Sequence, residues 1–296
     1  MKLLIKTCLT PTILCSELKV KQYKELLKTT YGEEPNIQIF LETLWDILAE
    51  LTGKQKIFFK QINIIDLLLV VLQIRIASQG DACDIILTHE GKKANVEMKL
   101  DCCIEDIQHT FCCNLEQTIS YNGVDIIIGC PSSERLLETT EEDYLHYIKE
   151  ARFTLNGETA HVNIEHNTRA KQIFEQLPPH ISMRIFKYVT DFNTIASELN
   201  LLDRYGCIEQ TINFMPSLES LMWFTKLLFS ESLEGFYNNV FYLSYLGHMN
   251  AEYIENCTPG EYLLFTQTLQ NNLNTNNQTD SSSPTEEQFQ DEVGEP

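Results

Sequence analysis

Hydrophobic residues recur with the helical period in two early segments of the chain. Between Asn36 and Gly53 this pattern predicts a helix with Asn36 as its N-cap. A second helix is predicted to begin at Asn63, with Asp66 in the capping-box position, and to end before Gly80. The second helix is apolar on nearly all sides but contains Asp66 and is shorter than the roughly 20 apolar residues of a membrane span. We therefore expect it to be a buried core helix.

The hydrophobic period changes to two after Gly80. Residues 84–88 and 94–100 predict a β-hairpin, because the second segment alternates apolar and charged side chains. Val124–Ile128 is a continuous apolar run that predicts another strand. A second hairpin is predicted over 153–162, with its turn at Asn156-Gly157.

Helical patterns dominate the rest of the chain. A helix is predicted from about Glu141 to Lys149, and Pro178-Pro179 opens a longer one. Apolar and aromatic stripes after Pro216 predict two more helices, and we expect those stripes to lie in the core. Thr258-Pro259-Gly260-Glu261 has capping-box spacing and predicts the start of a last helix. From Gln270 onward the polar composition predicts disorder.

These elements together predict an α+β fold. Residues 1–166 are expected to form a small antiparallel sheet flanked by helices. A helical region follows over 167–269, and a disordered acidic tail over 270–296.

Charge narrows the classes of function. The 296 residues include 22 Lys and Arg against 42 Asp and Glu, a net charge of -20. Such a chain lacks the clustered cations that neutralise nucleic-acid phosphates or bind anionic membranes, so neither partner is expected. Lys6 and Pro11 interrupt the apolar N-terminus, so no signal peptide is expected and the chain is predicted to be cytoplasmic.

The ten cysteines are expected to be thiols in that compartment. Cys102-Cys103 and Cys112-Cys113 resemble the paired ligands of zinc ribbons, but zinc knuckles separate their ligands by two to four residues. Adjacent cysteines on an extended strand would also point to opposite faces. We expect small buried apolar residues here, and no metal or cofactor. His161 and His166 lack the spacing of a helical zinc pair and are expected at the surface.

One constellation has the order of a metal-dependent nuclease. Asp84 on one predicted strand and Glu97-Met98-Lys99 on the next resemble the signature of the restriction-endonuclease superfamily. In that arrangement Asp84 and Glu97 would hold Mg²⁺, and Lys99 would act as base or stabilise charge. The same alternation of Glu and Lys is typical of the solvent face of any amphipathic strand. Glycine loops for phosphate and serine elbows are absent from the sequence.

The order of motifs from about Leu18 to Leu269 resembles the baseplate hub family of T-even-type contractile-tailed phages (myoviruses). The motifs that carry this resemblance are Leu72-Gln73-Ile74-Arg75-Ile76-Ala77-Ser78-Gln79-Gly80 before a hairpin, the Pro178-Pro179 helix, Leu227-Leu228-Phe229, Leu233-Glu234-Gly235-Phe236-Tyr237, Tyr242-Leu243-Ser244-Tyr245, Glu252-Tyr253-Ile254 and Thr258-Pro259-Gly260-Glu261-Tyr262. Some relatives have a cysteine-rich insertion in the hairpin, where this chain has only Cys83.

The resemblance implies a noncatalytic structural or assembly protein that binds other baseplate hub and tail proteins, as a part of the particle or as a transient assembly chaperone. The implied location is the tail baseplate of the virion, or the host cytoplasm during assembly. Exposed aromatic residues would carry most of such contacts, and Trp223, Phe236 and Tyr242 are candidates. The nuclease remains the alternative, and a helical adaptor of the host is a third possibility.

Overall fold

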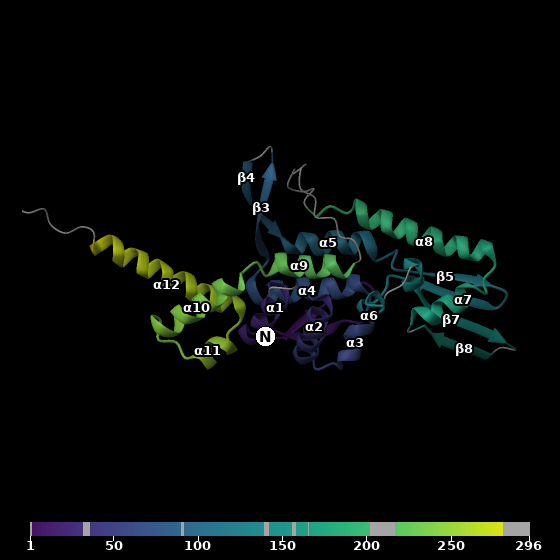
Figure 1. The fold of residues 1–296 in the computed structure, drawn as a ribbon, viewed down its shortest axis with the longest axis horizontal. Coiled ribbons are helices and arrows are strands. Elements are labelled where there is room, and N and C mark those ends of the chain that lie inside the picture. Colours follow the sequence, from purple (N-terminus) through teal and green to yellow (C-terminus); the bar gives the residue numbers. More distant parts are fainter. Residues whose placement is uncertain are drawn as a thin grey trace, which may run out of the picture.

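The computed structural model describes residues 2–31, 36–89, 92–138, 142–155, 158–164, 166–201 and 217–280. The molecule is elongated, with a helical body in the middle, a four-stranded sheet at one end and three helices at the other (Figure 1). Helices and small antiparallel sheets together confirm the predicted α+β class.

The body is built around α4, which is buried on nearly all sides. It contacts β1, α5 and α9, and the body also contains β2, which pairs with β1, and the helices α1, α2 and α3. The elements of the body are β1 (Lys2–Ile5), β2 (Ile13–Ser16), α1 (Val20–Tyr31), α2 (Ile37–Thr52), α3 (Lys56–Gln61), α4 (Ile64–Gln79), α5 (Leu100–Phe111) and α9 (Leu218–Leu228). Among the described residues, no helix combines the length and apolar character that crossing a bilayer requires.

The predicted caps of α2 and α4 are confirmed. Asn36 Oδ1 accepts a hydrogen bond from the backbone N–H of Ile39 at 3.1 Å, and Gly53 ends α2 in the left-handed conformation with φ of 68°. Asn63 Oδ1 likewise accepts from the N–H of Asp66 at 2.8 Å. Each cap pairs a backbone group that the helix itself leaves without a partner.

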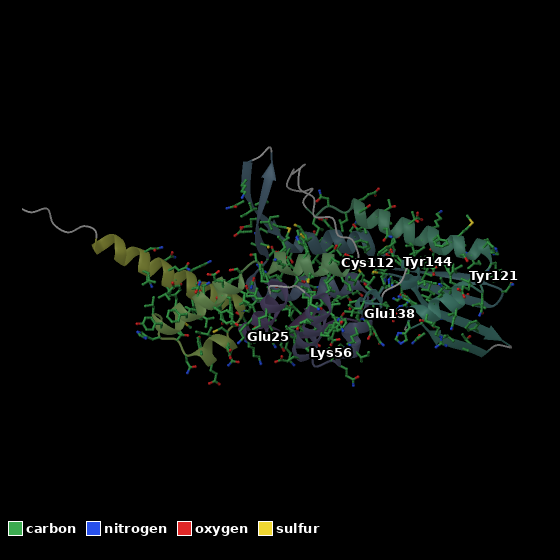
Figure 2. All side chains as sticks on the ribbon, viewed as in Figure 1. Glu25, Lys56, Cys112, Tyr121, Glu138 and Tyr144 are labelled. Carbon is green, nitrogen blue, oxygen red and sulfur yellow. A yellow bond between two sulfur atoms is a disulfide. The ribbon has the colours of Figure 1, made fainter. Side chains whose placement is uncertain are left out.

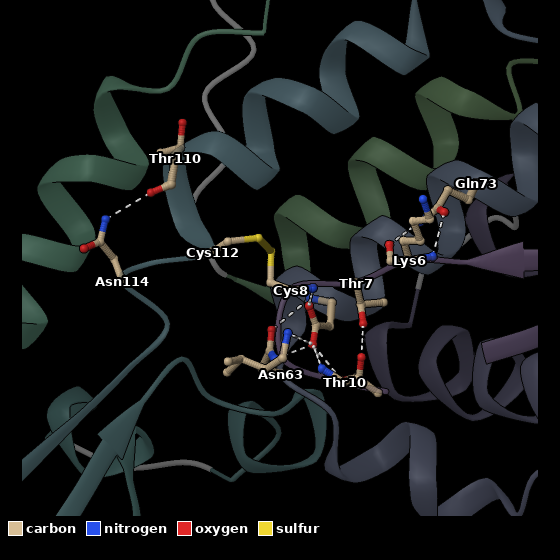
Figure 3. The surroundings of a disulfide bond; sticks show 11 residues. Lys6, Thr7, Cys8, Thr10, Asn63, Gln73, Thr110, Cys112 and Asn114 are labelled. Carbon is tan, nitrogen blue, oxygen red and sulfur yellow. Dashed lines mark hydrogen bonds between the residues drawn. A yellow bond between two sulfur atoms is a disulfide. The ribbon is translucent and has the colours of Figure 1, made fainter. Parts of the chain in front are cut away.

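The carboxylate of Asp66 holds the loop between β1 and β2. It accepts the backbone N–H groups of Cys8, Leu9 and Thr10 at 2.7, 3.2 and 2.8 Å, and the Thr10 hydroxyl at 2.6 Å. The Asn63 amide donates a further bond at 3.0 Å. Figure 3 shows Cys8, Thr10 and Asn63 gathered at this point. Asp66 is completely buried, so these donors replace its hydration shell.

The predicted first hairpin is confirmed and projects from the body (Figure 1). It consists of β3 (Ala82–His89) and β4 (Lys92–Lys99), paired antiparallel. The second strand ends one residue earlier than predicted, because Leu100 already begins α5 and its side chain is buried.

The four-stranded sheet at one end of the molecule has the order β5-β6-β7-β8. The turn between β5 and β6 uses Asn122 and Gly123, both with positive φ, as a tight hairpin turn requires. The turn predicted at Asn156-Gly157 lies outside the described residues. The elements of this end are β5 (Glu116–Tyr121), β6 (Val124–Gly129), α6 (Ser133–Leu136), η1 (Asp143–Tyr147), β7 (Ile148–Leu155), β8 (Glu158–Asn163), α7 (Asn167–Phe174) and α8 (Pro179–Glu198).

The helix predicted from Glu141 to Lys149 is wrong. Residues 143–147 form only the short 3-10 helix η1, and β7 starts at Ile148. Ile148 and Ala151 are fully buried in the sheet, and pairing with β6 on one side and β8 on the other outweighs the weak local helical pattern.

Three helices form the other end of the molecule: α10 (Leu233–Tyr245), α11 (Ala251–Asn256) and α12 (Pro259–Asp280). The predicted capping box at the start of α12 is confirmed. Glu261 N–H donates to the Thr258 hydroxyl at 3.3 Å, and Thr258 N–H donates to the Glu261 carboxylate at 2.8 Å.

The predicted start of the disordered tail at Gln270 is wrong, because α12 continues to Asp280. Leu269 and Leu273 line a small apolar cavity of about 90 Å³ together with Leu243 of α10, so the extension packs on a neighbour. Once a helix has begun, each added residue forms a further hydrogen bond at low cost. The rest of the predicted tail, 281–296, lies outside the described residues.

Glu231 joins α10 to α12 through a buried carboxylate. Its Oε1 accepts from the Tyr262 hydroxyl and the Asn239 amide, both at 2.9 Å, while Oε2 is buried without a hydrogen-bond partner among the described residues. Burial raises the pKa of Glu231, and the hydrogen bonds only partly oppose this. The folded state therefore holds the proton to a higher pH than the unfolded chain does.

We expect the ionisation of Glu231 to destabilise the folded state as pH rises. Because its pKa is raised in the folded state, the free energy of unfolding falls with pH from the unfolded pKa up to the folded pKa. Glu231→Gln removes this loss, so in urea unfolding the stability of the variant relative to the wild type should increase as pH rises above the ordinary glutamate pKa of about 4.5. Glu234→Gln, at an exposed position on α10, is the control and should leave the pH dependence unchanged. Parallel pH profiles for wild type and Glu231→Gln would contradict the prediction.

Candidate functional site

The three residues of the nuclease signature lie together on the exposed face of the β3-β4 hairpin. Asp84 directly faces Glu97 across the two strands, and Lys99 forms an ion pair with Glu97. The Glu97 and Lys99 side chains are 55% and 47% exposed, while Cys83 and Met98 are buried on the opposite face. Strand register thus brings the signature residues together, but on an open surface.

The geometry of a metal centre is not found in this part of the chain. Within the described ranges, no group of three or more His, Cys, Asp or Glu side chains is placed to hold a metal ion. The cavities identified in the described part of the chain, including one of about 520 Å³ beside α8, are lined by residues outside this hairpin. The nuclease signature therefore lacks the enclosed, dry surroundings in which catalytic electrostatics act strongly.

The prediction that all ten cysteines are thiols is wrong for one pair, because Cys8 and Cys112 form a disulfide. It links the loop held by Asp66 to the end of α5 (Figure 3). The pairing spans 104 residues of sequence, and spacing alone does not reveal a partner at that distance. The extended strand assumed for the cysteine doublets is also wrong: Cys102-Cys103 lies inside α5 and Cys112-Cys113 follows its end.

We expect the disulfide to stabilise the fold by about 2–4 kcal/mol, because it closes a long loop and so lowers the conformational entropy of the unfolded chain. Cys112→Ser should lower the free energy of unfolding by that amount, and a reductant should lower it similarly in the wild type. Urea unfolding with and without reductant measures both effects. Cys113→Ser, at the exposed neighbouring thiol, is the matched control and should change stability little. Equal stability of the two variants would refute the prediction.

The remaining buried cysteines behave as small apolar residues, as expected. Cys15, Cys83, Cys103, Cys130 and Cys257 are all buried as free thiols. Burial raises the pKa of Cys15 and of Cys130 to about 12, which keeps both protonated at neutral pH. They therefore lack the thiolate that nucleophilic or metal-binding chemistry requires.

His161 and His166 lie at separate surface positions, as predicted from the sequence. His161 lies on β8 with its Nδ1 2.7 Å from Glu150, and His166 precedes α7 with its Nδ1 2.7 Å from Glu138, which is labelled in Figure 2. Both side chains are more than half exposed. Each histidine thus has its own carboxylate partner.

A polar cavity of about 280 Å³ lies beside the four-stranded sheet, and two ion pairs lie in its lining. Lys149 pairs with Glu116, and Arg152 pairs with Glu150 at 2.8 Å. Arg135 is buried in the wall of the cavity and donates five hydrogen bonds to oxygen atoms of the protein. The cavity is therefore a place where the fold satisfies its own buried charge.

The three candidate aromatic anchors differ in exposure. Trp223 is 49% exposed and Tyr242 is 46% exposed, so both can reach a partner. The expectation for Phe236 is wrong: it is 2% exposed and packs against the rings of Tyr23 and Tyr262, with centroids 6.0 and 5.4 Å away. It lies on the side of α10 that faces the body and α12.

The opposite side of α10 carries an exposed aromatic cluster that the sequence analysis assigned partly to the core. We call Tyr237, Phe241, Tyr242 and Tyr245 the aromatic face of α10; these residues are 48%, 59%, 46% and 67% exposed. The rings of Phe241 and Tyr245 stack with centroids 5.6 Å apart. The expected core position is thus wrong for two members of the predicted stripe, Tyr237 and Phe241.

The signal for this face was present in the spacing. Residues 237, 241 and 245 follow one another at intervals of four and share one side of a helix. Phe236 and Leu243 fall on the other side, where both are buried. Two apolar sides on one helix indicate that one of them is available for contact beyond the chain's own core.

Comparison with known proteins adds no relative: the chain matches no family model, no curated protein and no solved structure.

Proposed function

We propose that this chain is a noncatalytic structural or assembly protein of the baseplate hub of a contractile phage tail. It acts through contacts with other hub and tail proteins, either in the tail baseplate or in the host cytoplasm during assembly. The resemblance of its motifs from about Leu18 to Leu269 supports the identity of the assembly. The surface of α10 supports the mode of action.

The observation that carries the proposal is the aromatic face of α10. Tyr237, Phe241, Tyr242 and Tyr245 are all close to half exposed or more on a single helix. Large rigid aromatic side chains supply most of the energy at protein interfaces, because they bury much apolar area at little entropic cost. A helix that presents four of them to solvent is suited to receiving another polypeptide.

The charge of the chain fits such a role. A net charge of -20 keeps copies of the protein apart in solution and limits self-association. An assembly protein with an exposed apolar surface needs that repulsion until its partner arrives.

Co-expression with the hub and tail proteins of the same phage tests the proposal. The tagged full chain should retain at least one hub protein through affinity purification. Phe241→Ala/Tyr245→Ala should lose it, while Met183→Ala, at a residue 69% exposed on α8, should keep it. Near-identical circular dichroism and melting of the variants would establish that both are folded. Failure of the wild type to retain any hub or tail protein would refute the proposal.

A nuclease assay tests the alternative independently. Asp84 and Glu97 face each other on the hairpin, as the nuclease signature requires. We expect no cleavage of DNA by the purified chain with Mg²⁺. Cleavage that Asp84→Asn abolishes would overturn the noncatalytic function, since that substitution removes one metal-binding carboxylate and little else.

A further inference from the structure

The C-terminal part of the chain has no lysine or arginine of its own. No Lys or Arg follows Lys226 in the sequence. The acidic residues of the described helices and their caps are Glu231, Glu234, Glu252, Glu255, Glu261 and Asp280. The end of the molecule formed by α10, α11 and α12 therefore carries negative charge only.

An exposed carboxylate, that of Glu234, lies at the N-terminal end of the aromatic face. Glu234 precedes Tyr237, Phe241 and Tyr245 by three, seven and eleven residues, which places all four on one side of α10. Glu234 is exposed and forms no ion pair within the described part of the chain. The aromatic face thus combines ring surfaces and an available anion.

The lysines of the neighbouring helix α1 are already occupied. Lys24 pairs with Glu255 and Lys28 with Glu25, each at 2.8 Å. Lys21 pairs with Glu50 at 3.1 Å. Lys28 also lies close enough to Tyr237 to interact with it electrostatically. Each of these lysines is thus paired with a carboxylate of the chain, and further positive charge for the aromatic face has to come from another molecule.

We propose that the aromatic face of α10 docks a basic segment, rich in Lys or Arg, of a partner protein. This inference rests on the proposed function and adds the chemistry of the partner. Lys and Arg bind over the faces of Tyr and Phe rings by cation–π attraction. The partner's apolar side chains cover the stacked Phe241 and Tyr245, and one of its cations pairs with Glu234.

A second copy of this chain does not have that chemistry. Its aromatic face would bring the same carboxylates with it, and two such surfaces repel each other. The repulsion is strengthened by the net charge of -20 on each copy.

A labelled peptide tests the inference directly. Fluorescence anisotropy would measure binding of an amphipathic Lys–Leu peptide to the full chain, beside a Glu–Leu peptide of the same pattern. We expect only the Lys–Leu peptide to bind. Phe241→Ala/Tyr245→Ala and Glu234→Lys should each weaken its affinity about tenfold, equivalent to about 1.4 kcal/mol.

Two matched variants control for non-specific attraction to an acidic protein. Phe153→Ala removes an aromatic side chain that is 40% exposed on β7, and Glu219→Lys reverses a first-turn carboxylate on α9. Both should change the affinity less than twofold. An equal effect of the α10 variants and these controls, or equal binding of the two peptides, would overturn the inference.

Other occupants give different results in the same preparations. If the wild type is a dimer in sedimentation equilibrium and Phe241→Ala/Tyr245→Ala is a monomer, the aromatic face binds a second copy of the chain and not a basic partner. If the wild type co-sediments with phosphatidylcholine vesicles and the same variant does not, the aromatic face binds a lipid surface and not a basic partner. Retention of a hub protein without peptide binding would overturn this inference and leave the proposed function intact. Peptide binding without retention of any hub protein would overturn the proposed function and leave the binding of basic segments intact.

Discussion

Replacing Asp66 with alanine is expected to destabilise the protein by about 4 kcal/mol. The carboxylate accepts the N–H groups of Cys8, Leu9 and Thr10 and the Thr10 hydroxyl, within 2.6–3.2 Å. Alanine leaves these donors without an acceptor in a site from which solvent is excluded, at a cost of about 1–3 kcal/mol for each donor that stays buried. The loop can recover part of this cost by moving toward water.

Urea unfolding of Asp66→Ala and Asp66→Asn measures the effect. The asparagine side chain keeps one acceptor oxygen but turns an NH₂ group toward N–H donors, so we expect a smaller loss of about 2–3 kcal/mol. Asp46→Ala is the control: Asp46 is 65% exposed and pairs with Lys56 at 2.7 Å, a surface contact worth about 0–1 kcal/mol. A loss for Asp66→Ala as small as that for Asp46→Ala would show that the loop does not depend on the carboxylate.

Helices with a strong period and a recognisable cap were predictable from the sequence. Asn36, Asn63 and Thr258 each begin a helix where predicted, because a cap is a contact between residues only a few positions apart. The end of α12 was not predictable in the same way. Its last turns are polar, and the packing of Leu273 on α10 depends on where another helix lies.

Elements that depend on distant partners were missed or assigned incorrectly. The strands β1 and β2 are four residues long, so alternation over them is too short to detect. A helix was predicted from about Glu141 to Lys149, although 143–147 form only η1 and Ile148 already begins β7, which pairs with β6. The donors that Cys8, Leu9 and Thr10 supply to Asp66, and the partner of Cys112, lie 56 or more residues away, and nothing in local spacing identifies them.

The candidate site divides in the same way. Alternation predicted the hairpin and placed Glu97 and Lys99 on the charged face of its second strand. The register that puts Asp84 opposite Glu97, and the exposure of Glu97 to solvent, did not follow from the sequence. Aromatic residues occupy cores and interfaces alike, so Phe236 and Phe241 could not be told apart by residue type. Only the arrangement of α1 and α12 around α10 determines which of the two is buried.

Arg135 is the second residue whose replacement should have a large effect. Its guanidinium donates to the backbone oxygens of Leu145, Ile148 and Ile164 at 2.6–3.1 Å, and to Asn167 Oδ1 at 3.1 and 2.6 Å. Burial lowers its pKa, although a guanidinium stays charged at neutral pH. All five N–H donors thus have acceptors, and they tie η1, β7 and the start of α7 together.

We expect Arg135→Met to cost about 3–5 kcal/mol, because carbonyl oxygens that lose their donor stay buried. Arg135→Lys should cost nearly as much, since an ammonium has three donors and cannot reproduce the planar fork. Arg152→Met, at a side chain 41% exposed, should change stability little. Hydrogen exchange should locate the loss: amides of β7 and β8 exchange faster in Arg135→Lys, while those of α4 keep their protection. Uniformly faster exchange across both regions would mean that Arg135 supports the whole fold rather than the sheet end, and unchanged stability would mean that its hydrogen bonds are replaced by water.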